Sequence, residues 1–379
     1  MRLAPLLCAL LLLPIESQSC LWDQDTIREE FAEAPSVFKT LAGWFNRYPP
    51  LYYEMRLERV TEELASQPES LSLYDDAAVS CDRLGRHDEA IEWMAKKVEY
   101  LHLEPADAPQ PTHRYRTLAN LGTFHAHRWG SQAPMARKAD KTDLEQAIKH
   151  VSSAIEENPD AHFGREVMQL MVLEWLAEDH MEEGVIHDLV TRHASNLQLH
   201  GHHPKEICEG LDGLIRLGNA WRSPDIHYLY MKALWSNGYH YPSLIAGWRA
   251  EELLSERGSF RHPILNELAI SPLQAALGSK EDHKLAIAYG KKARAAAAKR
   301  HEARTTYLLG KLKKGLHPDT HPGFWNDWKE PAFPKPPFQP MKKVKKHFPV
   351  LVLTFGGIPL LISLGLFLFS RVSGKKSSA

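Results

Sequence analysis

Histidine is the residue type whose abundance first suggests chemistry. The sequence holds 21 histidines among 379 residues, and imidazole is a common ligand of transition metals. The densest cluster, His200, His202 and His203, stands beside Gly201 and Pro204, which predict a loop. Zinc sites in proteins use three or four ligands with fixed supporting hydrogen bonds. The sequence shows no further ligands here, so we expect no metal site and no cofactor, and we keep metal binding through histidine-rich loops as the alternative function.

Two other histidine groups fit structural roles better than ligand sites. His125 and His127 are two residues apart in a predicted helix, so their side chains point to different sides. Residues 315–328 gather two histidines, two aspartates and two tryptophans close to the C-terminal end of the body. Terminal units of helical arrays need a cover, and we predict that role for His317, Asp319, His321, Trp325 and Trp328.

Catalytic signatures are missing from the sequence. It contains no G-x-S-x-G, no H-E-x-x-H, no P-loop and no G-x-G-x-x-G. The 46 basic residues are balanced by 47 acidic ones, so no global field would attract nucleic acid. Only four cysteines occur, without a C-x-x-C pair, which disfavours a disulfide framework and a cysteine zinc site. We therefore predict a protein that is not an enzyme and does not bind nucleic acid.

The N-terminal residues 1–19 have the layout of a secretory leader. Arg2 supplies a positive charge, Leu3 to Leu13 form a short apolar stretch, and Ser17 and Ser19 supply small residues before Cys20. The apolar stretch is too short to span a bilayer. We predict cleavage before Cys20, and lipidation of that cysteine is a further alternative.

The C-terminal region contains a candidate membrane helix. Residues 348–370 are 23 residues without a charge, with lysines before them and a basic tail, 371–379, after them. At about 1.5 Å per residue this length crosses a hydrocarbon core of about 30 Å. The lysines are more numerous on the predicted outer flank, against the positive-inside rule. We give the leader more weight and expect the body on the exported side, with a cytoplasmic tail.

Residues 330–347 precede that candidate span and are rich in proline and lysine. The stretch 330–340 alone has five prolines in eleven positions, which prevents a helix and favours an extended polyproline conformation. We predict a semi-rigid stalk between the body and the membrane.

The body, residues 20–329, is predicted to be all-α. Alanine, leucine, glutamate and lysine dominate long stretches, while the alternation typical of strands is scarce. In 71–101 the apolar residues recur at helical spacing in two runs, one before and one after Leu84 and Gly85. Glycine is typical of the left-handed residue that ends a helix, so Gly85 is expected to end the first run. Asp88 is the expected cap of the second helix.

A second predicted helix pair lies in residues 115–161. Ala147, Val151 and Ala154 share one face, and Pro159 ends the unit. Between the two helices stands an insert of about a dozen residues, 130–142, which we expect to form a loop. Weaker helix pairs are predicted around Pro49-Pro50, around Asn237-Gly238 and in 282–300.

These units resemble the tetratricopeptide repeat, a helix–turn–helix unit of about 34 residues. The best matches are 71–104 and 115–161, although Lys97 replaces a small residue of the pattern. With the leader, the "CLWDQDT" start and the C-terminal span, the chain is similar to repeat proteins anchored in bacterial envelopes. The resemblance implies an α-solenoid whose concave groove, lined by first helices, binds a peptide or a partner's helix.

The resemblance also implies which residues line that groove. In the first unit they are Asp75, Asp76, Val79, Asp82 and Arg83. In the second unit they are Arg116, Ala119, Asn120, Thr123 and His127. Asn120 stands where the family grips a peptide backbone, whereas Asp76 stands there in the first unit. We expect a membrane-anchored scaffold for protein–protein contact, with the metal-binding or hydrolytic protein as the alternative.

Overall fold

The computed structural model describes residues 21, 36–108, 110–158, 165–177, 204–217, 220–262, 265, 271–272, 276, 278–338, 354–355 and 358–359. The predicted leader and the cluster His200, His202 and His203 lie outside these residues. The chain divides into two compact units, Met1–Pro336 and Pro337–Ala379.

The second unit contains one short pair of strands. β1 (Thr354–Phe355) and β2 (Ile358–Pro359) are antiparallel, with Thr354 opposite Pro359. They fall in the predicted membrane helix 348–370, whose other residues lie outside the described part. Among the described helices of the chain, none combines the length and the apolar character needed to cross a bilayer. The membrane helix therefore stays a prediction.

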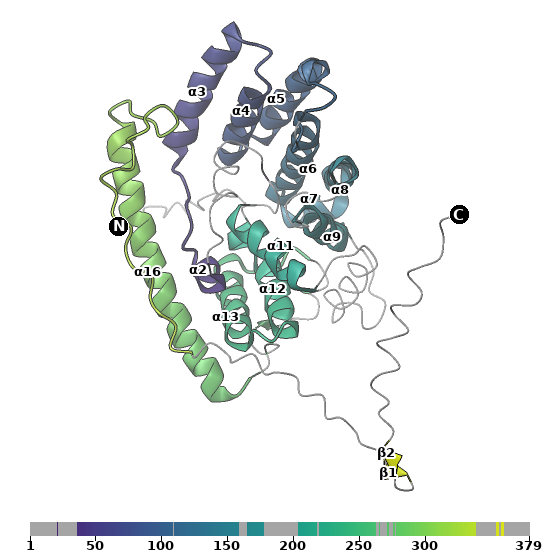
Figure 1. The fold of residues 1–379 in the computed structure, drawn as a ribbon, viewed down its shortest axis with the longest axis vertical. Coiled ribbons are helices and arrows are strands. Elements are labelled where there is room, and N and C mark those ends of the chain that lie inside the picture. Colours follow the sequence, from purple (N-terminus) through teal and green to yellow (C-terminus); the bar gives the residue numbers. More distant parts are fainter. Residues whose placement is uncertain are drawn as a thin grey trace, which may run out of the picture. The chain divides into compact units, whose positions relative to one another are not determined.

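The first unit is helical wherever its described residues form regular structure (Figure 1). This confirms the all-α prediction for that part of the chain. The short helices are α2 (Val37–Ala42), α7 (Pro134–Ala139), η1 (Leu101–Leu103) and η4 (Ala220–Arg222). The longer ones are α3 (Pro50–Ser66), α4 (Leu71–Arg83), α5 (His87–Tyr100), α6 (His113–Ser131), α8 (Thr142–Glu157), α9 (Arg165–Ala177), α11 (Pro204–Arg216), α12 (Pro224–Ser236), α13 (His240–Arg257) and α16 (Lys280–Leu312).

Most of these helices pack against the next one along the chain. The strongest pairs are α3 with α4, α4 with α5, α6 with α8, and α12 with α13. Several of these helices bury one apolar face, for example Ala147, Val151 and Ala154 on α8. Because such a face needs a partner, neighbouring helices bury one another in sequence.

Glycine sets the turn inside two of these pairs. After α4, Gly85 has a φ of 77° and donates to the Asp82 carbonyl, while Arg86 donates to the Cys81 carbonyl at 2.8 Å. This is a Schellman end, as the Leu84-Gly85 pair predicts. Gly238 has a φ of 78° after α12, with the same pattern of bonds.

Two local expectations in the repeat region are wrong. Asp88 does not cap α5, which begins at His87 without a side-chain cap; its carboxylate instead accepts a bond from the Arg128 guanidinium at 2.6 Å. The insert 130–142 is not simply a loop, because it contains α7. Pro134 at the first position of that helix favours its start, and the Arg137 carbonyl accepts a bond from the Trp129 indole.

Close helix contact in the second pair depends on a small residue. A Cβ added at Gly122 of α6 would lie 2.5 Å from Cγ2 of Val151 on α8. Glycine therefore allows the two backbones to approach at this point. The preceding helix pair, α4 and α5, also packs against a residue from the N-terminal region. Leu21, next to the predicted cleavage site, is fully buried in a cluster that includes Tyr74 and Met94.

The last long helix brings the two ends of the helical array together. Helix α16 packs against α13, against α2 and against α3, and it runs beside these helices in the ribbon (Figure 1). Helix α2, although first in the sequence, also contacts α11 and α13. The first and last described helices are therefore neighbours, whereas an open solenoid keeps its ends apart.

Candidate functional site

The predicted groove residues gather where α4 and α6 lie side by side. We call this contact the α4–α6 seam and define it by the ten residues predicted to line the groove. Eight of them are buried: Asp75, Asp76, Val79, Asp82, Ala119, Asn120, Thr123 and His127. Arg83 and Arg116 are half-buried. The seam is thus a charged interior more than an open surface.

Asp75 is the centre of one half of the seam. Both of its carboxylate oxygens accept bonds from the Lys97 ammonium of α5, at 2.7 and 2.8 Å. The Asn120 amide of α6 donates to the same carboxylate at 3.1 Å, and Nδ1 of His113 lies 3.7 Å away. Three helices therefore meet on one aspartate.

The charges of this pair depend on each other. Burial by itself raises the pKa of Asp75, but the attraction and hydrogen bonds of Lys97 and His113 outweigh it and hold the pKa below its ordinary value. Burial lowers the pKa of Lys97 in spite of Asp75. The buried ammonium therefore needs this carboxylate as its counter-charge.

Asp82 is the centre of the other half. Nδ1 of His127 donates to its two oxygens, at 2.6 and 2.7 Å, and Nδ1 of His87 donates at 2.9 Å. The side chains of Asp82 and His127 are 0% and 2% exposed, and that of His87 is 14% exposed. Since a carboxylate can only accept, each imidazole carries a proton on Nδ1.

Burial and charge act differently on the three groups around Asp82. Burial alone raises the pKa of Asp82, but the two histidines outweigh it and lower that pKa. Burial lowers the pKa of His127 more than Asp82 raises it. For His87 the hydrogen bond that it donates to Asp82, together with the attraction of that carboxylate, prevails over burial and raises the pKa of His87. His87 is thus the member of the group that carries a positive charge most readily.

The two halves follow the same spacing along the chain. Asn120 and Asp75 are 45 residues apart, and so are His127 and Asp82. Equal spacing means that α4 and α6 are in register, with corresponding positions facing each other. This is the geometry expected of two successive repeat units.

The remaining seam residues connect it to other parts of the first unit. Arg83 donates to the Leu217 carbonyl at 3.0 Å, which links α4 to the end of α11. The Ser80 hydroxyl donates to the Asp76 carbonyl at 2.6 Å within α4. His125, two residues before His127, faces the other way and binds Asp143 of α8 at 2.9 Å. The prediction that these two histidines point to different sides is confirmed.

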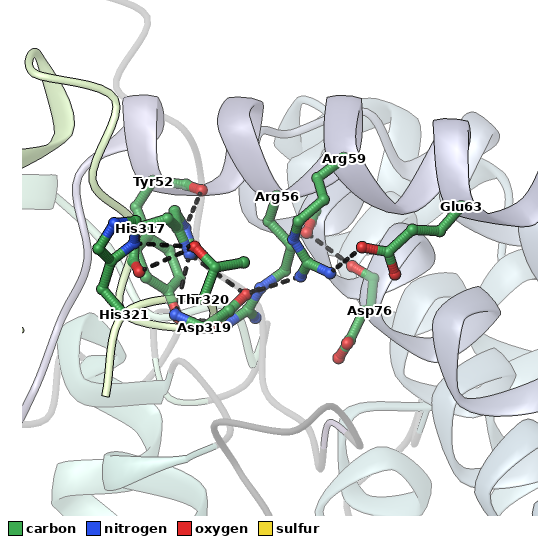
Figure 2. Close-up of polar contacts among 10 residues, drawn as sticks. Tyr52, Arg56, Arg59, Glu63, Asp76, His317, Asp319, Thr320 and His321 are labelled. Carbon is green, nitrogen blue, oxygen red and sulfur yellow. Dashed lines mark hydrogen bonds and ion pairs between the residues drawn. The ribbon is translucent and has the colours of Figure 1, made fainter. Parts of the chain in front are cut away.

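A second buried charged group joins the two ends of the helical array. The Arg56 guanidinium of α3 binds both oxygens of Asp319, at 2.8 and 2.9 Å, and Arg59 binds one of them at 3.0 Å (Figure 2). His317 stacks on Tyr52 with ring centroids 4.5 Å apart and donates to its carbonyl at 3.1 Å. We call this group the α3 closure. Residues 315–328 therefore do cover the end of the array, where the Phe324 carbonyl accepts bonds from Tyr307 and Lys311 of α16, and they also join this end to α3.

Two of the important residues escape the sequence reasoning for different reasons. Lys97 is visible as a departure from the repeat pattern, since it replaces a small residue, and that departure is the signal that could have identified it. Arg56 gives no such signal, because its partner Asp319 is 263 positions away.

The carboxylates and cations of the seam can bind groups of opposite charge. Among the described residues of the seam, no arrangement of nucleophile and base is apparent. Comparison with known proteins does not supply a function either: no family, no curated protein and no solved structure matches this chain.

Proposed function

We propose that this chain is a helical-repeat scaffold that binds a protein partner at the α4–α6 seam. The observation that carries the proposal is the register of α4 and α6, in which residues 45 positions apart face each other twice. Stacked helix pairs with first helices side by side form the continuous surface on which repeat proteins hold their partners. The proposed role is binding, without a chemical reaction.

The charge of the accessible residues indicates the partner's chemistry. Eight of the ten seam residues are buried, so a partner would meet Arg83 and Arg116, which are half-buried. Guanidinium groups pair with carboxylates through two parallel hydrogen bonds. We therefore propose that the partner presents an acidic segment to these two arginines.

A double charge reversal tests this proposal. In this experiment a photo-crosslinking amino acid is placed beside the seam of the full-length chain in its native membrane, and the proteins that it captures are identified. We expect R83E/R116E to abolish a reproducible crosslink, because the acidic segment would meet two carboxylates. Arg86→Glu is the matched control, since Arg86 is exposed and lies just outside the seam. Equal capture by R83E/R116E and by the unchanged chain would refute the seam as the docking surface.

We also propose that the body is held on the exported side of a membrane by residues 348–370. The support is the uncharged stretch of 23 residues and the leader-like start. Adding protease to intact cells or spheroplasts tests this topology. Digestion of the body before lysis supports it, whereas protection of the body until lysis would place the body inside.

A further inference from the structure

The group around Asp82 has the composition and geometry of an ion-free metal site. Nδ1 of His87, Nδ1 of His127 and an oxygen of Asp82 all lie within 4.8 Å of one another. The two imidazole rings are 5.8 Å apart between centroids. Among the described residues of the chain, these three form the one group of histidine and carboxylate side chains whose possible ligand atoms converge in this way.

We propose that Asp82, His87 and His127 bind a divalent transition ion of the zinc class. Two imidazoles and one carboxylate are ligands that zinc accepts, and three protein ligands leave a fourth position open. This proposal does not rest on the scaffold function. It also departs from the prediction of no metal site, and from the alternative that placed a metal at His200, His202 and His203.

The distances show what must move for an ion to enter. Asp82 is now 2.6–2.9 Å from the two Nδ1 atoms, as hydrogen bonds require. A tetrahedral zinc ion with bonds of about 2.0–2.1 Å keeps its ligand atoms roughly 3.3 Å apart. The three side chains therefore separate by about half an ångström or more, and each imidazole moves its proton from Nδ1 to Nε2 to free a lone pair.

The burial of the three ligands indicates a structural role with access from one side. Asp82 lies in the last turn of α4, His87 begins α5 and His127 lies in α6, so one ion would tie three successive helices together. Asp82 and His127 are almost fully buried, and His87 keeps 14% of its side chain exposed. The ion would enter past His87, where water can supply the fourth ligand.

Zinc retention by the full-length chain in detergent tests the site. The protein is loaded with zinc, desalted, and analysed for metal content, and its affinity is measured against a chromophoric chelator. We expect about one zinc ion per chain and a raised midpoint of thermal unfolding. His87→Gln and Asp82→Asn should each weaken binding by more than about 100-fold, since losing only an outer partner of a metal ligand costs up to that much.

Two control variants distinguish this site from other histidines. His102→Gln changes an exposed histidine just after α5 and should retain full affinity. H200Q/H202Q/H203Q removes the three imidazoles of the densest histidine cluster of the sequence and should also retain the ion. Circular dichroism confirms that each variant is folded, and Co²⁺ spectra of His87→Gln report the loss of an imidazole ligand. The proposal is overturned if the unchanged chain retains no zinc, if His87→Gln and Asp82→Asn bind normally, or if only H200Q/H202Q/H203Q loses the ion.

Discussion

The α4–α6 seam and the α3 closure both bury aspartates with cationic partners, but they join very different parts of the chain. In the seam, Asp75 meets Lys97 and Asn120 across 22 and 45 positions. In the closure, Arg56 meets Asp319 across 263 positions. The comparison shows that one type of contact serves two purposes here: the seam aligns neighbouring helix pairs, and the closure holds the ends of the array together.

The difference in separation has a consequence for stability and order of formation. Contacts between near positions cost little loop-closure entropy, whereas contacts across most of the chain must overcome more of it. We therefore expect the seam to stay intact when the closure is broken, but not the reverse. The predictions that follow test this expectation, starting with the largest effect.

Removing the central carboxylate of the seam should have the largest effect. Asp75→Ala leaves Lys97 buried without its counter-charge, and loss of one partner of a buried pair costs about 3–5 kcal/mol. Urea unfolding followed by circular dichroism measures the change. Asp107→Ala, at an exposed aspartate after α5, is the control and should change stability little. A loss for Asp75→Ala as small as that of the control would contradict the assigned role of the pair.

Breaking the closure should cost less and act locally. Arg56→Ala removes the two-bond partner of Asp319, but Arg59 still faces that carboxylate at 3.0 Å. We expect a loss of about 2–4 kcal/mol, below the full cost of an uncompensated buried charge. Hydrogen exchange should rise in α3 and α16 while α4 to α6 stay protected. Faster exchange in α4 to α6 to the same extent would show that the two regions unfold as one.

Two glycines outside the seam and the closure should give smaller effects of opposite sign. Gly122→Ala places a Cβ 2.5 Å from Val151 in the α6–α8 contact and should destabilise by about 1–3 kcal/mol through overpacking. Gly310→Ala in α16 meets nothing within 4 Å and should stabilise by up to about 1 kcal/mol through helix propensity. Thermal unfolding of the two variants measures both. A stabilising Gly122→Ala would mean that α6 and α8 pack less closely than described.

Mild acid should give the smallest effect. Burial raises the pKa of Asp319, but Arg56, His317 and Arg59 outweigh it and lower that pKa, and Asp75 has a lowered pKa for a similar reason. A carboxyl whose folded pKa lies below its unfolded value of about 3.9 stabilises the fold above that pH and loses this contribution as the pH falls through the folded pKa.

Urea unfolding at a series of pH values from 7 downward measures this loss. Buried histidines with a lowered pKa, such as His127 and His227, should begin the loss of stability below about pH 6.5, and the carboxyls should steepen it below about pH 4. Asp319→Asn and Asp75→Asn should each make the fall less steep, because one titrating group is gone. An unchanged slope in both variants would assign the acid sensitivity to other carboxyls.

Local pattern allowed much of the secondary structure to be predicted. The helix pair in 71–101, its glycine turn at Gly85 and the pair around Gly238 follow from apolar spacing and from the backbone freedom of glycine. The same reasoning failed at Asp88, because α5 already begins at His87 and Asp88 therefore lies inside the first turn and not at the cap position.

The arrangement of the candidate site, too, could be predicted only in part from the sequence. The resemblance to helical repeats predicted that Asp82 and His127 lie on one surface. It did not predict that both are buried or that His87 joins them. The sequence also predicted that residues 315–328 cover an end of the array, but not that they join this end to α3. Periodicity by itself determined which residues face inward along each helix. Only the tertiary structure decided which of those faces meet, because charges pair through space and the sequence does not record the distance between α3 and residue 319.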